Sequence, residues 1–383
     1  MTTIGIHDLE LATAHHVLDL GVLAEARGVD PGRYRVGIGQ DEMSFPAPDE
    51  DVVTMGAAAA LPILERHGTD GIRTLLFATE SGVDQSKAAG VFVHGLLGLA
   101  PQVRVVEFKQ ACYSATAALQ SAIGIISRAP AERVLVIASD VARYDLASPG
   151  EPTQGAGAVA MLVSADPALV EIEPVSGVHT ADVDDFWRPN DSSTAVVDGK
   201  LSVTVYLDAL LRAWHDLHDR GGPEIADIDR LIFHQPFTKM AVKAQRRLAH
   251  RLGVTLDETG LQTGSVYNKR LGNTYTASLY SALASLLHHE DDLEGRRIGM
   301  FSYGSGAVSE LLTALVRPGY RVPGAVERVT AMLEGRVPLE VADYERLHAT
   351  ELPSDADVET PRVTRGPFRF AGIQGRARRY ERT

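Results

Sequence analysis

Cysteine is almost absent from this chain of 383 residues, which contains only Cys112. No disulfide can form within the chain, and this favours a reducing compartment. Basic residues are also few, because 37 Lys and Arg stand against 50 Asp and Glu and give a net charge of −13. A surface of this sign repels phosphate polymers and argues against nucleic-acid binding.

Long hydrophobic runs are missing as well. Gly, Ser, Thr or charged residues interrupt every apolar stretch well before the ~20 residues that a membrane span requires. The first residues lack the basic and apolar regions of a signal peptide. We therefore expect a cytoplasmic protein that does not bind a membrane.

Motifs for nucleotides and metals are not found. The sequence contains neither a GxxxxGK[ST] loop nor a GxGxxG fingerprint, which excludes the common nucleotide-binding patterns. It also lacks HExxH, paired CxxC and EF-hand patterns, so no metal site is predicted. The remaining composition, with 45% hydrophobic and 23% charged residues, is that of an ordinary globular protein able to bury a large core.

Apolar segments of strand length alternate with helical segments, which predicts an α/β fold. The expected buried strands are 74–78, 134–139, 158–163, 231–233 and 298–302. The expected helices are 50–66, 86–97, 112–128, 201–218, 238–252, 274–288 and 325–333.

The order of these elements repeats along the chain. Leu75–Glu80 resembles Leu231–Pro236, and two further pairs of similar segments follow in the same order at similar separations. Chance likeness between buried strands is the alternative, but three ordered matches favour a duplicated α/β unit. The expected division is a first half at 1–165, an insertion or connecting region at 166–230, a second half at 231–318 and a C-terminal helical extension and tail at 319–383.

Cys112 begins a run of small residues that favours a tightly packed helix. At a helix N-terminus, free N–H groups and the helix dipole stabilise a thiolate, and Lys109 is close enough in sequence to add positive charge. Cys112 is therefore a candidate nucleophile, and an inert buried cysteine is the other interpretation.

Two further candidates follow matching strands of the repeat. Glu80 comes after the strand at 74–78, and His234 comes directly after the strand at 231–233. If the halves face each other, both side chains converge on Cys112. A Cys, a His and a carboxylate base suit covalent acyl transfer followed by carbon–carbon bond formation. A solvated carboxylate and a hydrogen-bonded core histidine are the alternatives.

Other ligand-binding candidates are a glycine loop and two lysines. Gly304-Ser305-Gly306 follows a strand, and its amides are suited either to binding a thioester oxygen or to a tight structural turn. Lys239 and Lys243 are four residues apart on a predicted helix, a spacing that fits phosphate binding or two solvated side chains.

The sequence resembles bacterial 3-hydroxy-3-methylglutaryl-CoA (HMG-CoA) synthases, which belong to the thiolase and ketosynthase superfamily. Matching motifs extend over nearly the whole chain. They are Val36–Gln40, Thr79–Ser81, Ser86–Ala89, Ala111–Tyr113, Glu151–Ala160, Asp185–Pro189, Val197–Gly199, Phe233–His234, Phe237–Met240, Gly272–Asn273, Tyr275–Thr276 and Phe301–Ala307.

This resemblance implies a thiolase-like fold of five layers built from two similar halves, a homodimer, and acyl-CoA substrates without a metal or organic cofactor. It implies that Cys112 is acetylated, that Glu80 removes a methyl proton, and that His234 and Asn273 orient acetoacetyl-CoA. Ser305 would contribute a backbone amide. Three further positions match residues near the family's site: Tyr144, Asp140 and Asp185.

The sequence departs from the family pattern at Ser114, at Ser192–Val196 and at Gln235. None of these removes a catalytic candidate, but they leave the acceptor open. HMG-CoA synthesis in the mevalonate pathway is the main hypothesis. The alternative is the same aldol step on a β-ketoacyl group carried by an acyl carrier protein, as in polyketide β-branching, with Arg246, Arg247 and Arg251 as candidates for docking that carrier. A scaffold subunit or a decarboxylating ketosynthase is disfavoured because Glu80, Cys112 and His234 are all present.

Overall fold

A nine-stranded mixed sheet forms the centre of the computed structural model, which describes residues 2–353 and 355–383. Its strand order is β11-β12-β13-β8-β1-β7-β6-β4-β5. The strands of the first half are β1 (Ile4–Thr13), β4 (Ile72–Ala78), β5 (Arg104–Phe108), β6 (Arg133–Ala142) and β7 (Gly155–Ala165). Those of the second half are β8 (Val170–Thr180), β11 (Arg230–Phe233), β12 (Arg297–Gly304) and β13 (Val308–Val316).

The two halves share one pairing pattern. In the first, β4 is parallel to β6, β6 is antiparallel to β7, and β7 is antiparallel to β1. In the second, β11, β12, β13 and β8 repeat these relations in the same order. Only two residue pairs join β1 to β8, so each half is in effect a separate sheet. The predicted duplication is confirmed.

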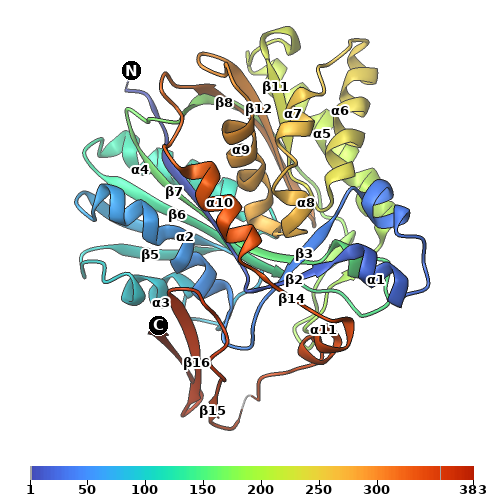
Figure 1. Cartoon of the computed structure of the whole chain (residues 1–383). Coiled ribbons are helices and arrows are strands. Elements are labelled where there is room, and N and C mark those ends of the chain that lie inside the picture. The colour runs from blue at the N-terminus through green and yellow to red at the C-terminus, as the bar shows by residue number, and fades with distance from the viewer. Residues whose placement is uncertain (1, 354) are drawn as a thin grey trace.

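Helices cover and separate these sheets (Figure 1). The outer helices of the first half are α2 (Val52–His67) and α3 (Ala89–Leu96), and those of the second are α5 (Gly199–Asp219) and α6 (Thr238–Leu252). A middle layer consists of α4 (Ser114–Arg128) and α9 (Ser278–His289), which share one buried cluster with strands of both halves. This arrangement is the predicted five-layered α/β fold.

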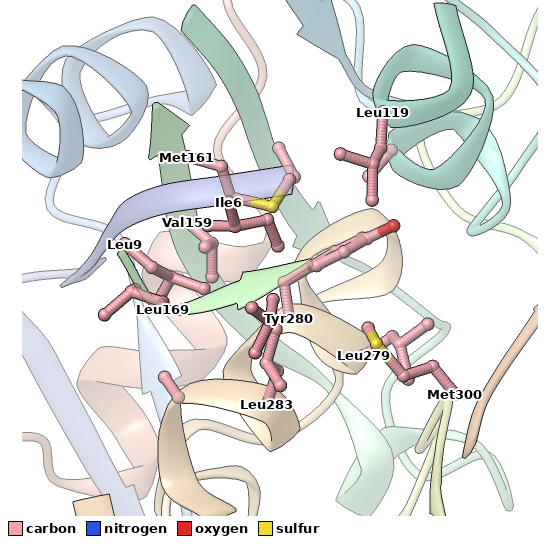
Figure 2. Close-up of a cluster of buried hydrophobic side chains, with 14 of the residues drawn as sticks. Ile6, Leu9, Leu119, Val159, Met161, Leu169, Leu279, Tyr280, Leu283 and Met300 are labelled. Carbon is pink, nitrogen blue, oxygen red and sulfur yellow. The ribbon is translucent and has the colours of Figure 1, made fainter. Parts of the chain in front are cut away.

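Helix α4 of the middle layer carries small buried residues. Ala115, Ala118 and Ala122 of α4 are fully buried, which lets the helix approach the strands closely. Figure 2 shows Tyr280 of α9 extending among side chains that include Met161 of β7. Its hydroxyl and that of Thr116 are 2.8 Å apart, so one polar contact joins the two helices. The layer therefore fixes the start of α4, which directly follows the turn that contains Cys112.

The remaining elements surround this centre. They are α1 (Leu20–Ala26), a π-helix at Arg33–Ile38, α7 (Thr259–Thr263), α8 (Asn268–Leu271), α10 (Ala325–Glu334), α11 (Val341–His348), β2 (His16–Asp19), β3 (Glu42–Phe45), β9 (Phe186–Trp187), β10 (Val196–Val197), β14 (Val337–Pro338), β15 (Val358–Glu359), β16 (Phe368–Gln374) and β17 (Ala377–Arg382), with 3-10 turns at Glu151–Thr153, Ile225–Asp227 and Tyr275–Ala277. Across the described residues, every helix is too short or too polar to span a bilayer.

Two segments differ from the expected organisation. The region 166–230 is not wholly an insertion, because it contains β8, a strand of the central sheet. The tail contains the expected helix as α10 and a second helix, α11, but it ends in a β-hairpin beside α3 (Figure 1). That hairpin turns through Gly375 and Arg376, whose φ angles of 56° and 66° give the positive values that a tight two-residue hairpin loop requires.

Candidate active site

The three candidate catalytic residues meet at one place. Glu80 follows β4, His234 follows the equivalent strand β11, and Cys112 occupies the turn before α4. The Cys112 thiol donates a hydrogen bond to Glu80 Oε1 over 3.1 Å. Cys112 and His234 line the same cavity, which has a volume of about 450 Å³. The duplicated fold therefore brings the two strand ends to the cysteine, as the repeat predicts.

A rigid turn holds Cys112. Ala111 has a φ angle of 44°, in the left-handed region that residues with a side chain rarely adopt. Ser114 stabilises this turn, since its Oγ accepts from Gln110 N over 2.5 Å and donates to Ala111 O over 2.9 Å. The departure from the family pattern at Ser114 thus serves the geometry of the nucleophile.

The pKa of the Cys112 thiol differs from the expectation. Burial raises the pKa of Cys112 well above its ordinary value, and the neighbouring negative charge of Glu80 raises it further. Cys112 lies near the N-terminus of α4, which begins at Ser114, as expected. Burial and the Glu80 carboxyl nevertheless raise the pKa of the thiol, whereas a helix N-terminus alone would lower it. Lys109 lines a second cavity rather than the one that holds Cys112. The resting cysteine is a protonated thiol.

Glu80 is the most perturbed carboxyl of the site. Burial, followed by the charge of Asp140, raises its pKa to about 8. Asp140 on β6 is itself fully buried and accepts from Glu80 N over 2.9 Å and from the Thr79 and Thr276 hydroxyls over 2.7 and 2.6 Å. These bonds hold the backbone of Glu80 in place and keep a negative charge behind it. A carboxyl with these properties can act as a general base near neutral pH.

His234 is buried and neutral. Burial lowers its pKa to about 3. Its backbone N donates to Phe301 O over 2.8 Å, and its carbonyl accepts from the Tyr206 hydroxyl over 2.7 Å. Among the described residues no partner hydrogen-bonds its Nδ1. A neutral imidazole fixed in this way can donate a hydrogen bond to a carbonyl oxygen but carries no charge at physiological pH.

The other predicted residues divide into three groups. Asn273, Ser305 and Tyr144 line the cavity with Cys112. Asp185 lies behind the glycine loop, where it accepts from Gly306 N and from the Tyr303 hydroxyl, both over 2.9 Å. Lys239 and Lys243 belong to α6 but do not line the cavity, although their helix contributes Met240 to it.

Sequence reasoning missed several residues of this site. Tyr206, Phe186, Tyr275 and Tyr303 form much of the cavity wall and come from four distant segments. Isolated aromatic residues give no local signal of such a role, although Phe186, Tyr275 and Tyr303 lie within motifs that match the family.

Comparison with known proteins decides the family. The model of the hydroxymethylglutaryl-coenzyme A synthase N-terminal domain matches residues 1–168, and that of the C-terminal domain matches residues 170–258 and 256–340. The chain belongs to the hydroxymethylglutaryl-CoA synthase family. It is 41% identical to the hydroxymethylglutaryl-CoA synthase of Enterococcus faecalis over 93% of this chain and 94% of the relative.

Other members of the HMG-CoA synthase family extend this comparison. A crystal structure of an HMG-CoA synthase complexed with CoA has a TM-score of 0.94 and 37% identity, with both chains covered completely. The polyketide 3-hydroxy-3-methylglutaryl-ACP synthase of Bacillus subtilis is 33% identical over 91% of this chain and 88% of its own. The HMG synthase of the curacin pathway has a TM-score of 0.90 and 32% identity over both complete chains.

Proposed function

We propose that this acyltransferase condenses acetyl-CoA with acetoacetyl-CoA and water to give HMG-CoA and CoA. The observation that carries the proposal is the hydrogen bond from Cys112 to a carboxyl whose pKa lies near 8, at the wall of a cavity shared with His234. This combination supplies a nucleophile, a base and a carbonyl-binding donor. The family relationship supports the same reaction.

In the first step, Cys112 Sγ attacks the thioester carbon of acetyl-CoA. The thiol proton passes through Glu80 to the departing CoA sulfur, so the products are acetyl-Cys112 and CoA. The Cys112–Glu80 distance of 3.1 Å allows this transfer directly. The amide of Ser305, in the glycine loop that Asp185 holds, would stabilise the developing oxyanion.

In the second step, ionised Glu80 removes a proton from the acetyl methyl group, and the resulting enolate attacks the ketone of acetoacetyl-CoA. The neutral imidazole of His234, assisted by Asn273, would donate a hydrogen bond to that ketone oxygen and transfer its proton as the oxygen becomes a hydroxyl. Glu80 then releases the methyl proton that it removed, and His234 takes up a proton, so the step has no net change in protons. Water then hydrolyses the Cys112 thioester, giving HMG-CoA and the free thiol. Cys112, His234 and Asn273 line one cavity, and Glu80 contacts the Cys112 sulfur from the neighbouring cleft. The proposal requires no metal or organic cofactor.

Several finer assignments belong to the same proposal. Tyr144 closes the acyl pocket beside Cys112, and Lys239 and Lys243 bind CoA phosphates where α6 borders the cavity. A homodimer, a cytoplasmic location and a role in the mevalonate pathway follow from the family resemblance and stay predictions. The segment boundaries at residues 165 and 318 also stay predictions, whereas residue 230 does not begin the second half, because β8 and α5 precede it.

A second candidate acceptor is an acetoacetyl group on an acyl carrier protein. The similarity to the Bacillus subtilis 3-hydroxy-3-methylglutaryl-ACP synthase supports it. The related curacin enzyme has been crystallised with a donor ACP, which shows that a member of the family can bind a carrier protein. The higher identity to the Enterococcus faecalis enzyme favours the CoA acceptor.

A steady-state assay with acetyl-CoA separates the two acceptors. Consumption of acetoacetyl-CoA is compared with that of acetoacetyl-carrier protein, with Cys112→Ala as the blank. We expect turnover with the CoA acceptor that the blank lacks. Turnover with the carrier protein alone would transfer the assignment to β-branching, and no acetylation of Cys112 with either would contradict the catalytic proposal.

The condensation rate is expected to rise with pH. Glu80 acts in its ionised form, and its pKa of about 8 means that most of the carboxyl is protonated at pH 6. We therefore expect kcat to increase about tenfold per pH unit below pH 7 and to level off above pH 9. His234 should add no ionisation to the profile between pH 5 and 9, because its pKa is about 3. A kcat independent of pH from 6 to 9 would contradict the assignment of Glu80.

Substitution of Gly304 should disturb the nucleophile from across the site. A Cβ at this position would lie 2.6 Å from Gln110 O and 2.7 Å from Tyr113 N, which belong to the turn that holds Cys112. Gly304→Ala should therefore displace the thiol and lower kcat by about 10²-fold. Gly95→Ala is the control, because a Cβ there meets no atom within 4 Å. Equal kcat values for the two variants would show that the turn tolerates the shift.

A further inference from the structure

Two adjoining cavities reach the catalytic residues. The first, described above, contains Cys112 and His234 in its wall. The second has a volume of about 870 Å³ and contains Glu80 together with charged side chains such as Asp84, Arg143 and Arg188. Asp84 and Arg188 are exposed, so this second cavity is a polar cleft that opens to solvent. The nucleophile and its base thus face different cavities although they share a hydrogen bond.

Three residues belong to the walls of both cavities: Phe186, Ala195 and Tyr275. The ring of Phe186 is central among them. Its centroid lies 5.9 Å from that of Tyr275 and 6.2 Å from that of Tyr144, in edge-to-face contacts. These aromatic contacts hold the ring in place between the cavity of Cys112 and the polar cleft.

The proposed reaction needs such a barrier. Acetyl-Cys112 is a thioester, and water that attacks its carbonyl carbon breaks the carbon–sulfur bond, leaving acetate and the Cys112 thiol. This hydrolysis wastes acetyl-CoA if it precedes the aldol step. Glu80 can act as the base for a water molecule that arrives from the cleft, because it lines the cleft and contacts the sulfur.

We propose that Phe186 is a specificity-determining residue that separates acetyl-Cys112 from the polar cleft and so keeps hydrolysis of the acetyl-enzyme slower than condensation. This inference rests on the proposed function, because it requires an acetyl-Cys112 intermediate. The reaction's last step consumes water, so the ring delays hydrolysis of the acyl-enzyme and does not prevent it.

The test measures breakdown of the acetyl-enzyme without acceptor. The full-length protein is acetylated with acetyl-CoA, freed from excess reagent and followed by mass spectrometry of Cys112. We expect Phe186→Ala to lose acetate about tenfold faster than the unsubstituted protein, since the two cavities then join. Because the rate constant refers to acetylated molecules only, a partly folded preparation does not distort it. A rate equal to that of the unsubstituted protein would overturn the inference.

Matched variants distinguish loss of the Phe186 barrier from a general disturbance of the site. Phe186→Leu keeps an apolar group of similar reach and should hydrolyse at close to the original rate. Trp187→Ala alters the exposed neighbour on the same short strand, which lines only the polar cleft, and should also leave the rate unchanged. The ratio of acetate to HMG-CoA formed with both substrates should rise for Phe186→Ala alone. Equal increases in all three variants would overturn the barrier, whereas failure of the unsubstituted protein to acetylate Cys112 would contradict the proposed function itself.

Discussion

Replacing Cys112 by alanine is expected to abolish covalent chemistry at this site. The side chain is the only thiol in the chain, and it lies in the cavity wall with His234. Without it no acyl-enzyme can form, and turnover of acetyl-CoA with acetoacetyl-CoA should fall by about 10⁴-fold or more. Incubation with radiolabelled acetyl-CoA followed by denaturation should leave label on the original protein and none on Cys112→Ala.

A control distinguishes the loss of chemistry from loss of structure. Alanine fits the space of the thiol, and neither the left-handed turn at Ala111 nor the hydrogen bonds of Ser114 involve the Cys112 side chain. The thermal unfolding midpoint of Cys112→Ala should therefore stay within a few degrees of the original. Label retained on the variant would mean that another residue accepts the acetyl group.

The repeat in the sequence explains why the catalytic centre could be predicted before the structure was known. Residues that follow equivalent strands of two facing halves must lie close together, and this places Glu80 and His234 at one site. Helix α6 was predicted at its observed bounds, Thr238–Leu252, because its apolar face and the glycine after it are local signals. The local sequence pattern was sufficient to predict an element where the residues of that segment alone determine its structure.

Features that depend on contacts between distant segments were not predictable in this way. The raised pKa of Cys112 comes from burial and a carboxylate on another strand, whereas the sequence near Cys112 indicated a helix N-terminus and hence a lowered value. Strand β8 was hidden because only part of it is buried and Pro174 interrupts its apolar pattern. The barrier at Phe186 exists only where β9 meets Tyr144 and Tyr275 in space.

Replacing Glu80 by glutamine is expected to separate the two halves of the reaction. Glutamine can still accept the hydrogen bond from Cys112, and loss of the negative charge lowers the pKa of the thiol toward its ordinary value. Acetylation of Cys112 should therefore persist, although more slowly, because the thiol proton must then pass to the CoA sulfur through water instead of through Glu80. Glutamine cannot remove the methyl proton, so HMG-CoA formation should fall by about 10² to 10⁴-fold. Single-turnover acetylation and steady-state condensation measure the two steps independently.

We expect Glu80→Gln to preserve or increase the stability of the protein at high pH, although it lowers the activity. Folding raises the pKa of the Glu80 carboxyl to about 8, so the folded state binds this proton more tightly than the unfolded state. The protein therefore loses stability as pH rises from the pKa of the unfolded carboxyl toward 8. Glutamine removes that loss. Above pH 8, Glu80→Gln should unfold at a temperature equal to or higher than the original protein while its condensation activity is almost gone. A variant that is both inactive and less stable at this pH would show that Glu80 is needed for the fold and would contradict its assignment as a buried base.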